Sequence, residues 1–365
     1  MKIKLGDLTR IKTGKLDANA SSPDGKYPFF TCSREPLRIN SYSYDCECVL
    51  VAGNGDLNVK YYNGKFDAYQ RTYIIEENGA GKLFMPYLYY FLDGYVEELR
   101  KLSIGGVIKY IKLGNLTDAL IELPDIQSQR AIVDILTKAK GIIDIRKQEL
   151  QSLEDLIKAR FVEMFGSANP SWPTVTIGDI CTDTRTGPFG SALHHDEFVD
   201  DGIFVLGIDN AVENRFSYNR MRYITEEKYQ QLKRYTVHPG DVIITIMGTI
   251  GRSAVIPDDM PLAINTKHLA CLTPDYTRVG SVFLCSAFQM HPEVQRQLTG
   301  NAKGAIMDGL NLGIIKGLRF QLPPLQEQIS FEHFYAQVDK SKAAVQKALD
   351  EAQVLFDSLM QQYFG

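Results

Sequence analysis

The chain has 365 residues, is 44% hydrophobic and 10% aromatic, and carries a formal net charge of −4. That length and apolar content suffice for two domains with separate cores, and no run of 18 or more apolar residues predicts a membrane span. The six cysteines form no C-x-x-C pair, and the start MKIKLGDL lacks the apolar core of a secretory signal. We therefore expect a cytoplasmic protein with reduced thiols.

Residues 1–122 are predicted to form a first globular domain. The runs CVLVAG (residues 48–53) and RTYIIE (71–76) are strand-like, residues 86–102 are helix-like, and Gly, Asn, Asp and Pro mark the turns between them. The domain is almost neutral, with 16 basic and 15 acidic side chains. This balance does not indicate a nucleic-acid-binding surface, and such a surface would require local sorting of charges.

A long helix is predicted over residues 123–166, which open with LPDIQSQ and close with FG. In a strict 4,3 spacing that starts at Ile132 and ends at Met164, eight of ten places are apolar; the exceptions are Arg146 and Arg160. A seven-residue repeat held over several heptads predicts a coiled-coil seam. A continuous helix over 126–164 would be roughly 58 Å long at about 1.5 Å per residue.

Residues 167–321 are predicted to form a second globular domain. The boundary segment SANPSWP (167–173) contains two prolines and the only tryptophan. The domain opens with VTIGD (175–179), which parallels IKLGD at residues 3–7. The runs GIFVLGI (202–208), DVIITIMG (241–248) and HLACLT (268–273) are strand-like, and residues 279–298 are helix-like.

Residues 322–365 repeat the plan of residues 123–166 at an offset of 199 positions. They open with LPPLQEQ, end in FG, and are apolar at nine of ten places in the same 4,3 spacing, from Phe331 to Tyr363. Two unrelated amphipathic helices, each packed on its own domain, would not explain the equal lengths and matching borders. We therefore predict a duplicated unit whose two long helices pair with each other.

Three stretches are similar to parts of active sites. NPSW (169–172) is similar to an amino-methyltransferase tetrad, but Ser171 replaces the second proline. ENGAGKL (77–83) lacks the first glycine and the final Ser or Thr of a phosphate-binding loop, which favours a turn. His194 and His195 precede Asp196 and Glu197 without a spaced partner, which argues against a metal site. Catalytic residues that are distant in sequence and meet only in the folded protein form no sequence motif.

The order of these parts resembles the DNA-specificity subunit of a Type I restriction–modification system. The resemblance covers essentially the whole chain and is carried by the two LP-x-x-Q-x-Q phrases with their long helices and FG ends. W-x-x-V-x-I-GD at 172–179 and the stretch from V-x-PGD-V-I-I-T to GTIGR at 237–252 also fit.

The resemblance implies an α+β fold with two mixed α/β target-recognition domains, separated by two long helices that form an antiparallel coiled coil with a pseudo-two-fold internal repeat. Each domain would read one half of a bipartite, gapped DNA site. The helices would dock two methyltransferase subunits, with restriction subunits joining them. The chain itself would be non-catalytic, with S-adenosylmethionine, ATP and Mg bound by the partner subunits.

Base reading needs Arg, Lys, Asn and Gln on turn-rich connections, and phosphate contacts accept any cation. By that criterion the predicted DNA-binding residues of the first domain are Arg34, Arg38, Asn54, Asn58, Lys60, Tyr61, Lys65, Gln70, Arg71 and Lys109. Those of the second domain are Arg185, Ser191, His194, Asn210, Arg215, Arg252, Asn265, Lys267 and Lys303.

Apolar residues off the helical seam are the predicted partner-binding residues, because a two-helix rod leaves apolar area uncovered. They are Ile126, Ile135, Ile142, Ile145, Leu156, Phe161, Phe334 and Leu355. Two other functions stay open. A stand-alone DNA methyltransferase or nuclease would act on DNA without a partner. A purely structural coiled-coil protein would show no salt-dependent DNA binding.

Overall fold

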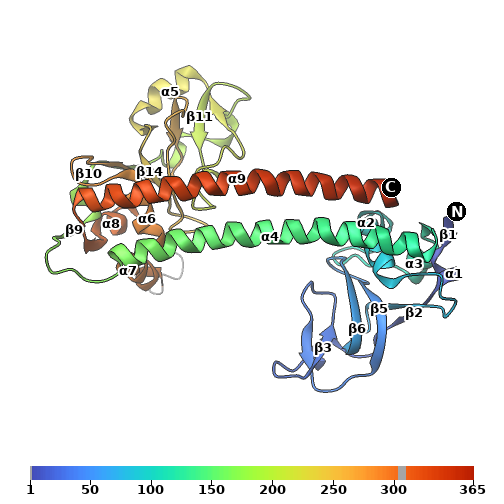
Figure 1. The fold of residues 1–365 in the computed structure, drawn as a ribbon. Helices are drawn as coiled ribbons and strands as arrows, with labels where there is room; N and C mark the ends of the chain where they lie inside the picture. Colours follow the sequence, from blue (N-terminus) through green and yellow to red (C-terminus); the bar gives the residue numbers. More distant parts are fainter. Residues whose placement is uncertain (1, 303–309) are drawn as a thin grey trace. The chain divides into compact units, whose positions relative to one another are not determined.

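The computed structural model describes residues 2–302 and 310–365 (Figure 1). Contacts within the chain divide it into two compact units: the first contains Met1–Gln148 and Gln346–Gly365, and the second contains Glu149–Val345. Each unit therefore combines a globular part with pieces of both long helices. Among the helices of the described residues, none is both long and apolar enough to cross a membrane.

The globular part of the first unit is built on a six-stranded sheet with strand order β2-β7-β5-β6-β3-β4. Neighbouring strands are antiparallel except β3 and β6, which are parallel. The strands are β2 (Thr9–Thr13), β3 (Tyr27–Phe30), β4 (Leu37–Ile39), β5 (Tyr44–Ala52), β6 (Val59–Ala68) and β7 (Thr72–Glu77). The two runs predicted as strands lie in β5 and β7, so that prediction is confirmed.

The central strand β5 is buried on both faces. Val49 and Val51 pack in the cluster that includes helix α2 (Met85–Leu102), whereas Cys48 and Leu50 pack with Phe66 in another cluster. This is the two-residue alternation of a strand. Helix α2 has proline in its first turn, where a missing N–H is tolerated. It confirms the helix predicted at residues 86–102.

A small frame holds each globular part where its long helix begins. In the first unit, β1 (Lys2–Lys4) pairs with β8 (Leu120–Glu122), next to α1 (Leu5–Leu8) and α3 (Leu113–Thr117). In the second unit, β9 (Thr174–Thr176) pairs with β18 (Arg319–Gln321), next to η2 (Ile177–Ile180) and α8 (Leu312–Gly317). One backbone hydrogen bond recurs in both, from Leu5 to Ala119 at 2.8 Å and from Ile177 to Leu318 at 3.0 Å. The repeated sequences IKLGD and VTIGD therefore fold alike.

The second unit contains two four-stranded sheets, with orders β10-β17-β14-β15 and β12-β11-β16-β13. The strands are β10 (Cys181–Thr186), β11 (Ile203–Leu206), β12 (Tyr223–Ile224), β13 (Thr236–Val237), β14 (Val242–Thr245), β15 (Ser253–Val255), β16 (Ala263–Asn265) and β17 (Leu269–Pro274). The three predicted strand-like runs lie in β11, β14 and β17 and are confirmed. The other short elements of this unit are α5 (Glu226–Leu232), η3 (Gly190–Ala192), η4 (His195–Glu197), η5 (Ile208–Asn210) and η6 (Lys233–Tyr235), and the first unit also contains η1 (Ala18–Ala20).

The helical stretch predicted at residues 279–298 is confirmed, but it is divided. The structure has two helices there, α6 (Ser281–Met290) and α7 (Pro292–Ala302), with His291 in an extended conformation between them. Proline disfavours a helical conformation in the residue before it, and it has no N–H to continue the ladder. Pro292 therefore ends the first helix and begins the second.

The two long helices are α4 (Ile126–Phe165) and α9 (Leu325–Phe364), with 40 residues each. In the second unit, Glu154 of α4 forms an ion pair with Lys342 of α9 at 3.1 Å, and Phe161 stacks edge-on against Phe331 at 5.2 Å. As residue numbers increase along α4, the residue numbers of its partners in α9 decrease, so the two helices run in opposite directions. The predicted antiparallel coiled coil is confirmed.

The burial pattern supports the predicted seam with one correction. None of the ten seam positions in α9 is exposed, and in α4 only Arg160 is. At that end the buried stripe steps by four through Ile157, Phe161 and Phe165, because a straight helix drifts away from a strict heptad. Phe161 is completely buried and packs on Phe283 and Phe331. Its assignment to the partner-binding face is therefore wrong.

The last glutamine of each LP-x-x-Q-x-Q phrase is a buried clamp. The side-chain oxygen of Gln129 accepts a hydrogen bond from the Phe84 N–H at 2.8 Å, and its nitrogen donates to the carbonyls of Lys82 and Pro124. Gln328 makes the same three bonds, with the Gly280 N–H and the carbonyls of Arg278 and Pro323. Phe84 and Gly280 immediately precede α2 and α6, respectively. Each phrase thus ties the start of a long helix to a globular part.

Candidate nucleic-acid interface

Four loops of the first unit are joined by hydrogen bonds; we call residues 31–36, 53–58, 69–71 and 103–112 the first loop cluster. The Gly53 N–H donates to the Arg71 carbonyl at 2.8 Å, and the Gly55 N–H donates to the Lys109 carbonyl at 3.0 Å. The Asn58 side chain donates to the Cys32 carbonyl at 2.9 Å. Backbone and side-chain bonds therefore hold four separate loops together.

Besides Gln70, six predicted DNA-binding residues lie in or beside the first loop cluster: Arg34, Asn54, Asn58, Lys60, Arg71 and Lys109. Arg34 is held by an ion pair to Asp56 at 2.9 Å, and Asp56 also pairs with Arg100. Both arginines keep the pKa of the Asp56 carboxyl low. Burial lowers the pKa of Lys60, whose ammonium donates to the Asn58 side chain. The cluster thus presents cations and amides on a fixed base.

The side chains of the other four candidates of the first unit make contacts outside this cluster, although Gln70 itself belongs to the loop at residues 69–71. Arg38 donates to the Gly25 carbonyl at 2.8 Å, and Gln70 donates to Asp17 at 2.9 Å. Lys65 lies over the Tyr42 ring, and its contact with the Tyr42 hydroxyl raises its pKa. Burial and a hydrogen bond to Glu47 raise the pKa of Tyr61 to about 12. The linear sequence had no means of separating these residues from the cluster.

In the second unit, residues 206–210, 246–252 and 265–268 form a second loop cluster together with Arg222. The Thr266 N–H donates to the Leu206 carbonyl at 2.9 Å, and the Ile246 N–H donates to the His268 carbonyl at 3.0 Å. Arg222 is ion-paired with Asp209. The predicted residues Arg252 and Lys267 are exposed here, whereas Arg222 was missed because it lies in the irregular segment SYNRMRY, away from any glycine-rich turn.

Several buried polar atoms of the second loop cluster have no partner. In the described part of the chain, the buried side-chain atoms without a hydrogen bond are Arg222 Nη1, Asn265 Oδ1 and Thr266 Oγ1. The pKa of the nearby His268 is lowered by burial and by the positive charges of Lys267 and Arg222. The cluster is therefore cationic even with a neutral imidazole.

Three predicted DNA-binding residues of the second unit are engaged inside it. Arg185 forms an ion pair with the buried Asp241 at 2.5 Å and donates twice to the Thr236 carbonyl. Asn210 bonds to the Gly207 N–H and to the Ser217 carbonyl, and Asn265 donates to the Leu269 carbonyl. Both asparagines are completely buried. These contacts favour a role in shaping the domain over direct contact with DNA.

The remaining candidates of the second unit lie apart from one another. His194 is exposed, and its backbone N–H donates a hydrogen bond to the Glu197 carboxylate at 2.7 Å. Arg215 is exposed and lines a cavity of about 320 Å³ with Tyr335 and Asp339 of α9. The backbone of Ser191 lies in η3. Lys303 lies outside the described residues.

The two stretches NPSW and ENGAGKL, which are similar to active-site motifs, are occupied by hydrogen bonds and packing contacts within the chain. In NPSW, the Gln321 side chain bonds to both backbone groups of Asn169 at 2.8 Å, and Trp172 packs on Phe165. In ENGAGKL, the Glu77 carboxylate accepts the N–H groups of Gly79 and Lys82, which a phosphate would otherwise accept. Among the described residues, no group of three or more His, Cys, Asp or Glu is arranged to hold a metal ion.

Apolar side chains are exposed along both long helices. On α4, Ile135, Ile142 and Ile145 are 41%, 47% and 57% exposed, and Leu156 is 46% exposed. On α9, Leu355 is 55% exposed. Ile126 and Phe334 are half-buried, and the Arg160 guanidinium lies over the Phe334 ring. All predicted partner-binding residues except Phe161 therefore keep accessible surface.

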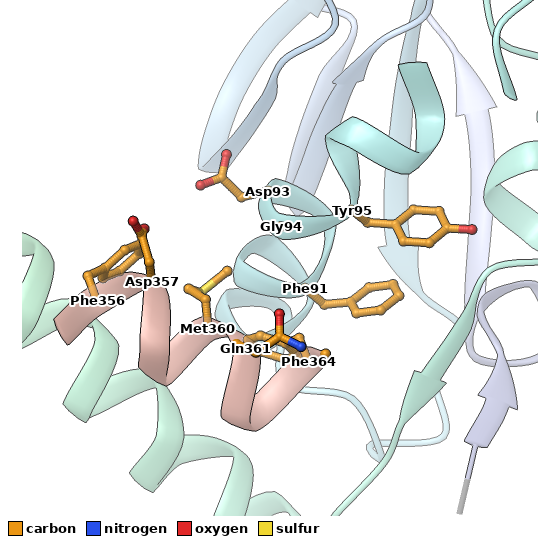
Figure 2. Close-up of a pocket in the computed structure, with 10 residues that line it drawn as sticks. Phe91, Asp93, Gly94, Tyr95, Phe356, Asp357, Met360, Gln361 and Phe364 are labelled. Atoms are coloured by element: carbon orange, nitrogen blue, oxygen red, sulfur yellow. The ribbon is translucent and has the colours of Figure 1, made fainter. Parts of the chain in front are cut away.

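The FG dipeptides anchor the helix ends on equivalent aromatic residues. In the first unit, Phe364 packs on Tyr87 of α2 at 5.0 Å. Met360 lies against Gly94, beside a cavity of about 350 Å³ that Phe364 also lines (Figure 2). In the second unit, Phe165 packs on Phe283 of α6, also at 5.0 Å. Tyr87 and Phe283 are each the third residue of their helix. The repeated FG thus has the same packing role twice.

His291 is predicted to make the second unit less stable in acid. Burial lowers its pKa below the ordinary value of 6.5, so the unfolded chain binds a proton at a higher pH than the folded chain. Unfolding free energy should therefore fall as the pH drops below about 6.5. His291→Phe, which suits a site between Phe161 and Phe320, should flatten this dependence in urea titrations from pH 7.5 to 5.5.

The exposed His333 on α9 provides the matched control. His333→Gln should leave the pH dependence unchanged. An unchanged slope in His291→Phe would contradict the assignment of the effect to His291.

Comparisons with known proteins agree with the resemblance. Residues 1–155 match the family model described as the Type I restriction modification DNA specificity domain. The EcoDI specificity subunit of Escherichia coli is 39% identical over 156 residues, 43% of this chain but only 34% of that protein. That alignment therefore spans about a third of the relative's length.

Two further comparisons extend over most of the chain. The EcoBI specificity subunit of Escherichia coli is 22% identical over 349 residues, which covers 87% of this chain and 73% of that one. The crystal structure of a Type I restriction–modification S subunit from M. genitalium covers all of this chain and 96% of its own, with a TM-score of 0.65 and 17% identity, and so shows the same fold. Residues 1–155 are therefore similar in sequence to Type I restriction–modification DNA specificity domains, and the whole chain has the fold of a Type I S subunit.

Proposed function

We propose that this chain reads a bipartite, gapped DNA site, with each globular part recognising one half. The observation that carries the proposal is the convergence of Arg34, Asn54, Asn58, Lys60, Arg71 and Lys109 from separate loops onto the first loop cluster. Arginine can donate hydrogen bonds to two acceptors on a base edge, and asparagine can bond to a donor and an acceptor. Lysine suits contacts with phosphates. Two related globular parts then supply two readers.

In the second unit, we propose that Arg252, Lys267 and Arg222 face DNA. All three belong to the second loop cluster, and Arg252 and Lys267 are exposed. Arg185, Asn210 and Asn265 instead hold the domain together. The DNA-contacting residues proposed for the second unit are thus chosen by their position in the second loop cluster and not by residue type alone.

We propose that the chain is a non-catalytic subunit and that partners supply the chemistry. Two methyltransferase subunits would dock on the exposed apolar faces of α4 and α9, with restriction subunits joining that core. S-adenosylmethionine, ATP and Mg would be bound by those partners. Apolar rows on a helix are a common basis for helix-in-groove recognition.

The alternative of a stand-alone methyltransferase or nuclease has a direct test. The purified chain is given a labelled methyl donor and mixed DNA, with and without methyltransferase subunits. We expect methyl transfer only with the partners present, at a two-part motif that methylome sequencing identifies. Transfer or cleavage by the chain alone would contradict the proposal.

Loss of clustered arginines should weaken and relax target binding. Arg71→Ala and Arg252→Ala should each cost about 1–3 kcal/mol if the residue reads a base, whereas Lys109→Ala and Lys267→Ala should weaken binding to all sequences and flatten its salt dependence. Affinity of the assembled complex for the target and for scrambled DNA, at several salt concentrations, measures both effects.

Arg38→Ala is the matched control, because Arg38 is exposed but lies outside the first loop cluster. We expect it to bind DNA like the unchanged protein. If Arg38→Ala weakened binding as much as Arg71→Ala, the proposed interface would be misplaced.

Charges placed on the exposed face of α4 should prevent partner docking. Ile135→Asp combined with Ile142→Asp puts two carboxylates where a partner helix would bury apolar side chains, and we expect co-purification with methyltransferase subunits to be lost. Leu120→Asp, on the exposed edge of the β1–β8 pair, is the control. Circular dichroism should show all of these variants folded.

A further inference from the structure

The first loop cluster ends in a narrow hairpin. Ile104 and Tyr110 pair through two backbone hydrogen bonds, of 3.0 and 2.8 Å. Gly105 has a φ of +119°, and a Cβ at this position would come within 2.6 Å of the Ile108 carbonyl oxygen. Only glycine fits such a turn without strain. The sequence GG at residues 105–106 therefore fixes the shape of the hairpin tip.

The tip carries two β-branched apolar side chains into solvent. Val107 is fully exposed and Ile108 is 63% exposed, while Ile104 and Tyr110 at the base of the hairpin are 42% and 39% exposed. A contiguous group of exposed apolar side chains on a folded protein marks a surface that contacts something. The hairpin bonds give it a defined position before any contact is made.

Charges around the tip indicate DNA as the occupant. The Lys109 carbonyl at the tip accepts a hydrogen bond from Gly55, and the Gly53 carbonyl accepts one from Ile111, so the hairpin is joined to the loop that also bonds to Arg71. Lys109 and Lys112 follow the apolar pair in the sequence, and both are exposed. Apolar groups next to cations match a DNA major groove, where phosphates border the C5-methyl groups of thymines.

We propose that Val107 and Ile108 are specificity-determining residues that contact thymine C5-methyl groups in the half-site read by the first unit. This inference rests on the proposed DNA-reading function and adds a base preference to it. Hydrogen-bonding residues of the first loop cluster would read other base edges, while the apolar tip distinguishes thymine from cytosine, which lacks the methyl group. A tip that instead wedges between base steps would respond to base stacking and not to the methyl group.

Uracil substitution tests the proposal, because uracil differs from thymine only by that methyl group. The full chain, assembled with methyltransferase subunits, is titrated with target duplexes in which each thymine of the first half-site is replaced in turn by uracil. We expect at least one substitution to weaken binding about four-fold, the factor that corresponds to ~0.8 kcal/mol for one buried methyl or methylene group. The Val107→Ala, Ile108→Ala double variant should bind thymine and uracil duplexes equally.

The exposed Leu120 on β8 supplies a control variant, because Leu120→Ala removes a similar apolar group away from the cluster and should keep the response to uracil. If the unchanged protein prefers its target but ignores every uracil substitution, the inference is wrong while the proposed function stands. A first half-site made only of G·C pairs would also overturn it. Failure to prefer any target over scrambled DNA would instead contradict the proposed function.

Discussion

Replacing Asp241 by alanine is expected to destabilise the second unit by about 3–5 kcal/mol, the usual range when one member of a buried ion pair is removed. Asp241 is 1% exposed at its side chain, and its carboxylate accepts hydrogen bonds from Arg185, the His238 N–H and the Thr273 hydroxyl. Without Asp241, the Arg185 guanidinium would remain buried but would lose its buried carboxylate partner. Urea unfolding followed by the fluorescence of Trp172, the only tryptophan, reports on this unit.

The same arginine provides the control. Arg185 also pairs with Asp183 at 2.7 Å, but the Asp183 side chain is 57% exposed. Asp183→Ala should therefore change stability by only about 0–1 kcal/mol, as exposed pairs do. The double variant Arg185→Met, Asp241→Leu removes both buried charges and should recover much of the loss. Equal effects of Asp183→Ala and Asp241→Ala would contradict the assigned role of burial.

The second large effect is expected at the glutamine clamps. Gln328→Leu removes an amide that satisfies the Gly280 N–H and two carbonyls, and a buried group left unpaired costs about 1–3 kcal/mol. We expect a loss of several kcal/mol in the second unit, again measured by Trp172 fluorescence. Gln129→Leu should do the same to the first unit, measured by hydrogen exchange of α2.

Each clamp has a control two residues earlier in its own motif. Gln127 and Gln326 are the first glutamines of the two phrases, and both are exposed. Their substitution by leucine should change stability little. If Gln326→Leu were as destabilising as Gln328→Leu, the motif would act through local helix propensity and not through the buried amide.

Much of the architecture was predictable because it repeats. Two equal segments with the same 4,3 spacing predicted α4 and α9, and the alternation of Val49 and Val51 with Cys48 and Leu50 follows from a buried strand. The break before Pro292 was predictable in principle from the proline alone. The shift of the seam to Phe161 depends on helix drift and on the aromatic residues that meet it, which a strict heptad count ignores.

The candidate interface was predictable only in part. Selection by residue type found Arg34 and Arg71, but it also selected Arg185, whose burial beside Asp241 depends on strands far apart in sequence. It missed Arg222, which reaches the second loop cluster through its pairing with Asp209. It could not find Val107 and Ile108 at all, because a search for hydrogen-bonding groups passes over apolar side chains.

The composition of the two units affects the order in which they are completed during synthesis. The second unit is one continuous stretch, Glu149–Val345, whereas the first unit also needs Gln346–Gly365, where Phe364 covers Tyr87. Those last residues leave the ribosome only after the whole second unit has been made. The unit that is translated first is therefore completed last. Until Phe364 has been synthesised, the Tyr87 face of α2 lacks the aromatic side chain that packs on it.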